Sequence, residues 1–116
     1  MKIDKYIEEA VTVGDKNGIE SLSELQKNIY IIAEAEISCD MDGIDSFIEK
    51  YNKKGVLEAS VAYSLIGAID IAKGLKEIAK ALPNPSETVL ERTNSFITER
   101  YNYSYESIKN YVAKNI

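Results

Sequence analysis

Residues 21–38 read SLSELQKNIYIIAEAEIS, and this stretch decides the fold. Apolar side chains recur in it every three or four residues, which is the period of a helix and not of a strand. Ser21 followed by Glu24 matches a capping box, in which each side chain satisfies a free backbone amide of the first turn. The pattern predicts a long helix over residues 21–38 whose buried face carries Leu22, Leu25, Ile29, Ile32, Ala33 and Ile37.

The helical period continues on both sides of this stretch, and no two-residue alternation persists long enough for a strand. Turn-forming residues separate the periodic segments. They predict further helices over residues 2–13, 44–51, 56–66, 68–82, 87–101 and 104–114. We therefore expect an all-α fold, a single compact bundle of about six or seven helices that makes one domain of residues 1–116.

Three glycines have predicted structural functions between these helices. Gly43 follows a turn in which Asp42 is the expected N-cap of the next helix. Gly55 ends the segment Asn52–Gly55, where two lysines near the negative end of the helix dipole and a final glycine predict a helix stop. Gly67 predicts a bend or a close helix contact. The apolar residues 56–66 lack a polar stripe, so we expect a heavily buried helix there.

Residue types that carry most catalysis are missing from the chain. It has no histidine, and Cys39 is its only cysteine, so His-based acid–base chemistry and a cysteine zinc site are excluded. No glycine-rich phosphate loop is present. We therefore expect a protein that is not an enzyme and holds no cofactor or metal. The absence of an apolar leader in MKIDKYIEEAV and of a long apolar run predicts a cytoplasmic protein without membrane contact.

The net charge of −5 is unevenly divided along the chain. Residues 1–49 hold twelve acidic and four basic side chains, a balance of −8, whereas residues 50–116 hold seven acidic and ten basic, a balance of +3. An acidic half repels the phosphate backbone, so direct nucleic-acid binding is not expected. The same charge suits a protein partner with a basic surface.

Six carboxylates fall within sixteen residues, with no cation between them. We expect five to form an acidic surface for that partner, namely Glu34, Asp40, Asp42, Asp45 and Glu49. Glu36 differs, because it falls on the apolar face of the long helix, where a carboxylate needs a partner. We expect a structural function for it, accepting hydrogen bonds from free amides near Gly43 and Ile44. A cation site formed with Asp40 and Asp42 is the alternative.

The stretch from about Tyr30 to Pro83 resembles the bacterial DNA-mimic protein family, long catalogued as a domain of unknown function. The matching pieces are Ala35-Glu36-Ile37, Asp42-Gly43-Ile44, Phe47-Ile48, Asn52–Gly55 and Leu65-Ile66-Gly67-Ala68. The family's asparagine-glycine-glycine-aromatic turn here reads Met41-Asp42-Gly43-Ile44. The resemblance implies an all-helical protein, often a homodimer, whose surface carboxylates imitate duplex phosphates and occupy the DNA-binding site of a transcription factor.

The sequence thus favours a non-enzymatic protein-binding module that engages a basic or DNA-binding protein. An immunity-type protein that neutralises a toxin is a second hypothesis, because such proteins are also short, acidic and helical. A metal-dependent enzyme built on carboxylates alone is a third.

Overall fold

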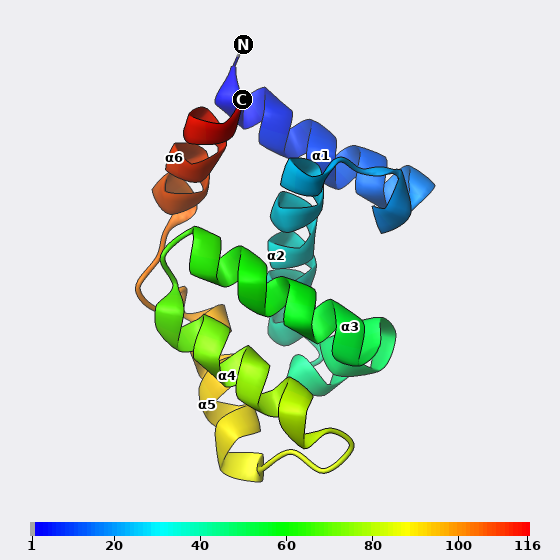
Figure 1. Ribbon diagram of the computed structural model, residues 1–116, viewed down its shortest axis with the longest axis vertical. Helices are drawn as coiled ribbons and strands as arrows, with labels where there is room; N and C mark the ends of the chain where they lie inside the picture. Colours follow the sequence, from blue (N-terminus) through cyan, green and yellow to red (C-terminus); the bar gives the residue numbers. More distant parts are fainter. Residues whose placement is uncertain (1) are drawn as a thin grey trace.

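The computed structural model describes residues 2–116, which form six α-helices and one short 3-10 helix. These are α1 (Ile3–Asn17), η1 (Ile19–Ser21), α2 (Glu24–Met41), α3 (Ile44–Leu65), α4 (Ile69–Ala81), α5 (Glu87–Thr98) and α6 (Tyr105–Asn115). No strand occurs in this part of the chain, so the predicted all-α bundle is confirmed. α3 and α4 run side by side in opposite directions, α1 crosses one end of α2, and α6 returns to α1 (Figure 1).

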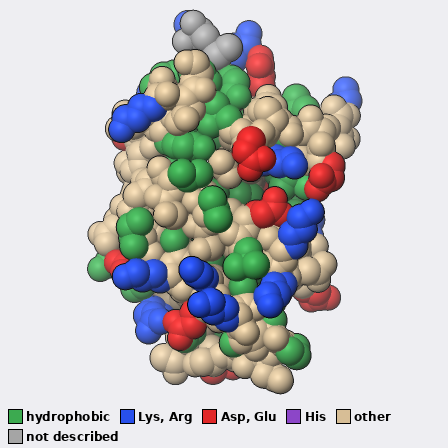
Figure 2. Space-filling view, viewed as in Figure 1, with side chains coloured by type: hydrophobic (Ala, Val, Ile, Leu, Met, Phe, Trp, Pro, Cys, Tyr) green, Lys and Arg blue, Asp and Glu red, His purple; other side chains and the backbone are tan. Residues whose placement is uncertain are grey.

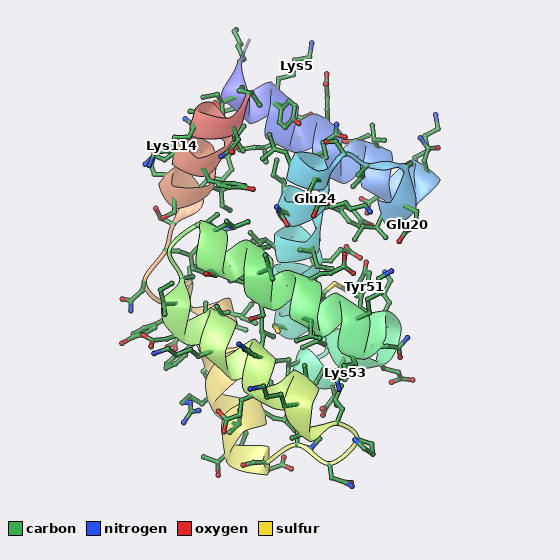
Figure 3. The ribbon with its side chains drawn as sticks, in the orientation of Figure 1. Lys5, Glu20, Glu24, Tyr51, Lys53 and Lys114 are labelled. Atoms are coloured by element: carbon green, nitrogen blue, oxygen red, sulfur yellow. The ribbon has the colours of Figure 1, made fainter. Side chains whose placement is uncertain are left out.

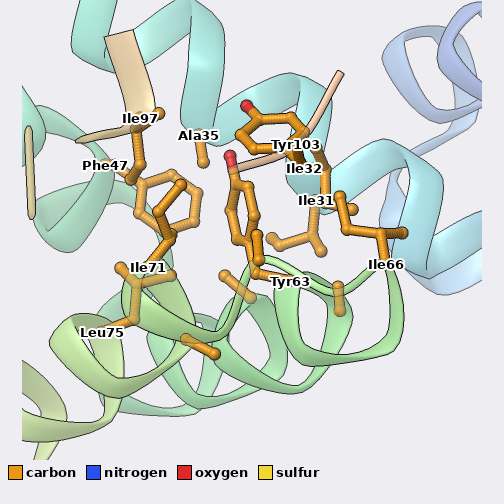
Figure 4. Packing of buried hydrophobic residues seen from close by; sticks show 14 of the residues in the cluster. Ile31, Ile32, Ala35, Phe47, Tyr63, Ile66, Ile71, Leu75, Ile97 and Tyr103 are labelled. Carbon is orange, nitrogen blue, oxygen red and sulfur yellow. The ribbon is translucent and has the colours of Figure 1, made fainter. Parts of the chain in front are cut away.

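The core forms around α2, which contacts α1, α3, α5 and α6. Its Ile31, Ile32 and Ala35 are almost fully buried. Figure 4 shows these side chains beside the ring of Tyr63 from α3, with Tyr103 from the segment before α6 packed close to it. Each large apolar side chain buried here stabilises the fold by about 1.5–3 kcal/mol. α2 is therefore the element on which the other helices assemble.

The N-terminal cap of α2 differs from the predicted one. The capping box is formed by Ser23 and Gln26: the Gln26 amide donates to Ser23 Oγ at 3.3 Å, and the Ser23 amide donates to Gln26 Oε1 at 3.0 Å. Ser21 instead ends η1, and its hydroxyl donates to the Gly18 carbonyl. Leu22 between them is extended and buried, so the helix begins only after Leu22 has entered the core.

α1 continues through the predicted break and ends at Gly18, which has a φ of +88°. Gly14 is helical and buried against the ring of Tyr30 on α2. A Cβ atom on Gly14 would lie 2.4 Å from Tyr30 Cδ1. Gly14 therefore allows α1 and α2 to approach closely and does not end the helix.

The predicted break between the helices at 44–51 and 56–66 is reduced to one residue. Asn52 has φ 61° and ψ −173°, and helical geometry resumes directly after it, so both halves belong to α3. Figure 3 labels Tyr51 and Lys53, the residues on either side of this kink. The prediction that Gly55 ends a helix is wrong, because Gly55 lies inside α3, where an added Cβ atom would overlap the Cβ of Tyr51.

The turns at Gly43 and Gly67 are confirmed, with φ of +92° and +88°. The prediction that Asp42 is the N-cap of the next helix is wrong, because Gly43 is the N-cap of α3 and Asp42 is the C-cap of α2. No atom lies within 4 Å of a Cβ position at Gly67, so it provides a bend and not a close helix contact.

The predicted burial of residues 56–66 is wrong for one face of α3. Val56, Ala59 and Ala62 are fully buried, but apolar side chains also cover the outside of the helix. The exposed residues are Leu57, Val61 and Leu65. An apolar segment without a polar stripe does not indicate which face the neighbouring helices will cover, and α4 covers only one.

We predict that the kink is strained in its backbone. The Asn52 dihedrals lie in a region that is essentially restricted to glycine and costs about 1–3 kcal/mol for other residues. Its side chain is exposed and makes no hydrogen bond among the described residues, so substitutions there report on the backbone. Asn52→Gly should be more stable than Asn52→Ala by about 1 kcal/mol or more in urea unfolding. Equal stability of the two variants would contradict this assignment.

Candidate functional site

Glu34 and Glu36 lie two residues apart on α2, and their side chains therefore leave the helix in nearly opposite directions. Glu34 is buried, with 8% of its surface exposed. Its Oε1 accepts hydrogen bonds from Lys50 Nζ at 3.0 Å and from the Tyr51 hydroxyl at 2.5 Å. The expectation that Glu34 contributes to an exposed acidic surface is therefore wrong, because a cation and a tyrosine from α3 cover it.

Glu36 likewise contacts a cation and a tyrosine, which come from the segment between α5 and α6. Arg100 approaches it with two nitrogens, Nε at 2.9 Å from Oε2 and Nη2 at 3.2 Å from Oε1, and the Tyr103 hydroxyl donates to Oε2. The prediction that Glu36 accepts hydrogen bonds from the amides near Gly43 and Ile44 is therefore wrong. The Gly43 amide donates instead to the Ser38 carbonyl at 2.9 Å.

The two clusters raise the pKa of the tyrosines that complete them. Burial contributes most, followed by the hydrogen bond and charge of Glu34 for Tyr51 and of Glu36 for Tyr103. Both hydroxyls therefore stay protonated and act as donors. Tyr30, which donates to Asp15, has its pKa raised to about 12, mainly by burial. Two of the six predicted carboxylates thus hold the fold together and are not free to contact a partner.

The other four predicted carboxylates are exposed and lie on either side of the α2–α3 turn. Asp40 and Asp42 are at the end of α2, and Asp45 and Glu49 follow at the start of α3. Asp45 and Glu49 are four residues apart and therefore share one helix face. None of the four forms an ion pair within residues 2–116. The structure thus brings these four together and separates Glu34 from them.

α5 adds two carboxylates that the sequence did not indicate. A shallow hollow beside Gly43 and Asp45 is also lined by Glu87 and Glu91, which are exposed and one helical turn apart. Asp45, Glu87 and Glu91 line this hollow together, and we use the name acidic corner for these three and the exposed Asp40, Asp42 and Glu49 around the same turn. The signal available in the sequence was the cap at Ser86 followed by glutamates, but nothing in it places α5 beside the α2–α3 turn.

Apolar side chains accompany these charges. Ile37, predicted to be buried, is 48% exposed, and Met41 is 75% exposed. Ile37 lies one turn before both Asp40 and Met41 on α2, so its side chain neighbours each of theirs on the helix surface. Methionine is enriched at protein interfaces while charged residues dominate their rims. The acidic corner therefore combines an apolar contact area with surrounding negative charge.

Between residues 2 and 116, no three side chains of His, Cys, Asp or Glu converge closely enough to hold a metal ion. The carboxylate-based metal site therefore has no candidate ligand set in that range. None of the helices in the same range has the length and apolar character needed to cross a bilayer.

The fold and the acidic corner define a class, that of small all-α proteins that present exposed carboxylates on a helical scaffold. Within it, the chain belongs to the DMP19-like protein family, whose model matches residues 20–113. The suspected DNA-mimic family is thereby confirmed, and the match extends beyond the stretch from Tyr30 to Pro83 in both directions. Neither the curated proteins nor the solved structures contained a match.

We predict that Glu36 and Arg100 stabilise the fold as a pair. In a double-mutant cycle with Glu36→Gln and Arg100→Gln, the coupling free energy should be about 1–2 kcal/mol. The reason is that the ion pair is bidentate and the Glu36 carboxylate is largely buried. The pair between Glu77 and Arg92 is the matched control: it is exposed, spans 3.7 Å and should give about 0–0.5 kcal/mol. Equal coupling in both cycles would contradict the structural function of Glu36.

A second prediction concerns alkaline pH. The pKa values of Tyr30, Tyr51 and Tyr103 are raised in the folded protein, so unfolded tyrosines lose their protons near pH 10 while these three do not. Their contribution to stability is therefore complete below pH 10 and is lost as the pH rises above it. An ultraviolet titration should show part of the tyrosinate signal appearing only as the helical circular dichroism disappears.

In that titration, Tyr51→Phe and Tyr103→Phe should each remove one tyrosine from the late step. Ionisation of all eight tyrosines in one step near pH 10, with native helicity retained, would refute the assignment.

Proposed function

We propose that this protein is a non-catalytic binding protein whose acidic corner occupies the DNA-binding site of a basic partner protein. One observation carries the proposal: six exposed carboxylates from three helices surround the α2–α3 turn, and none is paired with a cation in the described residues. Membership of the DMP19-like family supports the same reading.

The absence of ion pairs matters because a paired carboxylate presents little net charge to a partner. Lys50, which directly follows the acidic stretch, is paired with Glu34, and Arg100, which follows α5, is paired with Glu36. They therefore do not neutralise the corner. Lysines and arginines that normally contact DNA phosphates would meet carboxylates instead, and the attraction would act over a distance of about 10 Å in 0.1 M salt.

Ile37 and Met41 favour a protein partner over a small cation or a polyamine. These side chains are exposed beside Asp40, and covering them releases water from apolar surface. Electrostatic attraction would then accelerate encounter and orient the two proteins, while apolar contact would lengthen the lifetime of the complex. Binding to DNA itself is opposed by repulsion between the corner and phosphate.

We predict that neutralising the corner abolishes partner capture. The variant combines Asp40→Asn, Asp42→Asn, Asp45→Asn and Glu49→Gln, all at exposed positions. The immobilised protein, incubated with native lysate at about 50 mM salt, should retain DNA-binding proteins, and about 200 mM salt should weaken that retention. Duplex DNA added in excess should release the retained proteins, because both ligands occupy one site. The variant should retain none of them.

A matched control makes the same change in net charge elsewhere on the molecule. Glu8, Glu9, Glu24 and Glu99 are exposed and form no ion pair among residues 2–116, so neutralising these four should leave capture intact. Equal loss of capture in the two variants would indicate general charge attraction. If excess duplex DNA fails to release the captured proteins, the DNA-binding site of the partner is not involved in the complex. Either outcome would refute the proposal.

A further inference from the structure

An open groove runs between the outer faces of α3 and α4, away from the acidic corner. It has a volume of about 390 Å³. Six residues dominate its lining: Leu57, Val61, Leu65, Ile69, Lys73 and Lys76. α3 supplies the first three and α4 the last three, so the groove follows the line along which the two helices lie side by side (Figure 1).

The apolar side chains of the groove are exposed although they are large. Leu57, Val61 and Leu65 are 36%, 58% and 49% exposed, and Ile69 is 46% exposed. The three residues of α3 are spaced four apart, so they form a continuous stripe along one side of that helix. Contiguous exposed apolar surface of this kind marks an interaction site in a stable protein.

The charges at the groove have one sign. Lys73 and Lys76 line its α4 side, no carboxylate lines it, and neither lysine forms an ion pair within the described residues. In the space-filling view, lysine and arginine side chains gather over the part of this face where α4 lies, with apolar side chains beside them (Figure 2). A partner that fits must therefore be apolar along its centre and acidic along one edge.

A second copy of the chain does not meet this requirement. Two grooves paired about a two-fold axis would bring two pairs of lysines into one interface, where like charges repel. Pairing the groove with the acidic corner of another copy joins two different surfaces, and such contacts close only into rings or extend into filaments. The charge of the groove thus points to a different protein.

We propose that the groove between α3 and α4 binds an amphipathic helix of a partner protein, with its apolar residues on the stripe and its acidic residues beside Lys73 and Lys76. A helix presents apolar side chains at intervals of three and four residues, which matches the spacing of Leu57, Val61 and Leu65. This surface is opposite in charge to the acidic corner and does not depend on the function proposed for that corner.

The test uses two synthetic peptides of about 18 residues, roughly five helical turns. Both carry leucines along one face; one carries glutamates along the edge of that face, and the other carries lysines at the same positions. Fluorescence anisotropy should show micromolar binding of the glutamate peptide and at least about tenfold weaker binding of the lysine peptide. The double variant Lys73→Glu with Lys76→Glu should reverse this preference.

Val61→Glu places a charge in the centre of the stripe and should weaken binding of the glutamate peptide by at least about tenfold. Met41→Glu is the matched control: it changes an exposed apolar residue of the acidic corner and should leave peptide binding unchanged. Because both positions are exposed, circular dichroism should show unchanged folding.

Three results would overturn the inference. The glutamate peptide could fail to bind at about 1 mM. Val61→Glu could leave its binding unchanged. Sedimentation could show a dimer of the unmodified chain that Val61→Glu dissociates and Met41→Glu does not, in which case a second copy occupies the groove.

Discussion

Glu34 and Glu36 on α2 are each bound by a cation and a tyrosine hydroxyl from another segment, and these contacts constrain the arrangement of the other helices. A carboxylate in a helical core is costly unless cations and donors surround it. Glu34 meets that requirement with Lys50 and Tyr51, which sets where the first half of α3 lies. Glu36 meets it with Arg100 and Tyr103, which sets the path of the chain between α5 and α6. Two side chains only two residues apart on α2 thereby bind two different segments, one in α3 and one between α5 and α6.

This pairing has a consequence for the surface. Lys50 and Arg100 are paired with Glu34 and Glu36, and Asp40, Asp42 and Asp45 form no ion pair within residues 2–116. The position of α5 then brings Glu87 and Glu91 beside the α2–α3 turn. Exposed carboxylates from α2, α3 and α5 thus flank this turn, although the whole chain carries a net charge of only −5. Distribution of charge, rather than its total, makes electrostatic recognition of a basic protein reasonable here.

The molecule also presents a second surface of the opposite character. α4 covers the inner face of α3 and leaves Leu57, Val61 and Leu65 exposed, and its own lysines line the groove beside them. An acidic corner and a basic apolar groove on one small bundle would allow two different proteins to bind at once. The missing histidines and the lack of a converging metal-ligand group in residues 2–116 are compatible with such a binding function.

The helical period of the sequence was sufficient to predict the all-α fold and most of the helices, because that period depends on neighbours within one turn. The glycine turns at Gly43 and Gly67 were predictable for the same reason. Family membership could likewise be inferred from local motifs. Four exposed carboxylates of the acidic corner were predicted as members of one acidic surface, but Glu34 was wrongly included, and Glu87 and Glu91 were missed.

The side-chain contacts and the burial of the other residues depend on the tertiary structure and could not be predicted from the sequence. Arg100 lies sixty-four residues from Glu36, and no local pattern specifies that contact. The burial of Glu34, the exposure of Ile37 and Val61, and the addition of α5 to the acidic corner all depend on which helix faces meet. Amphipathic periodicity indicates that a helix has an apolar side, but packing against particular neighbours determines how much of that side is covered.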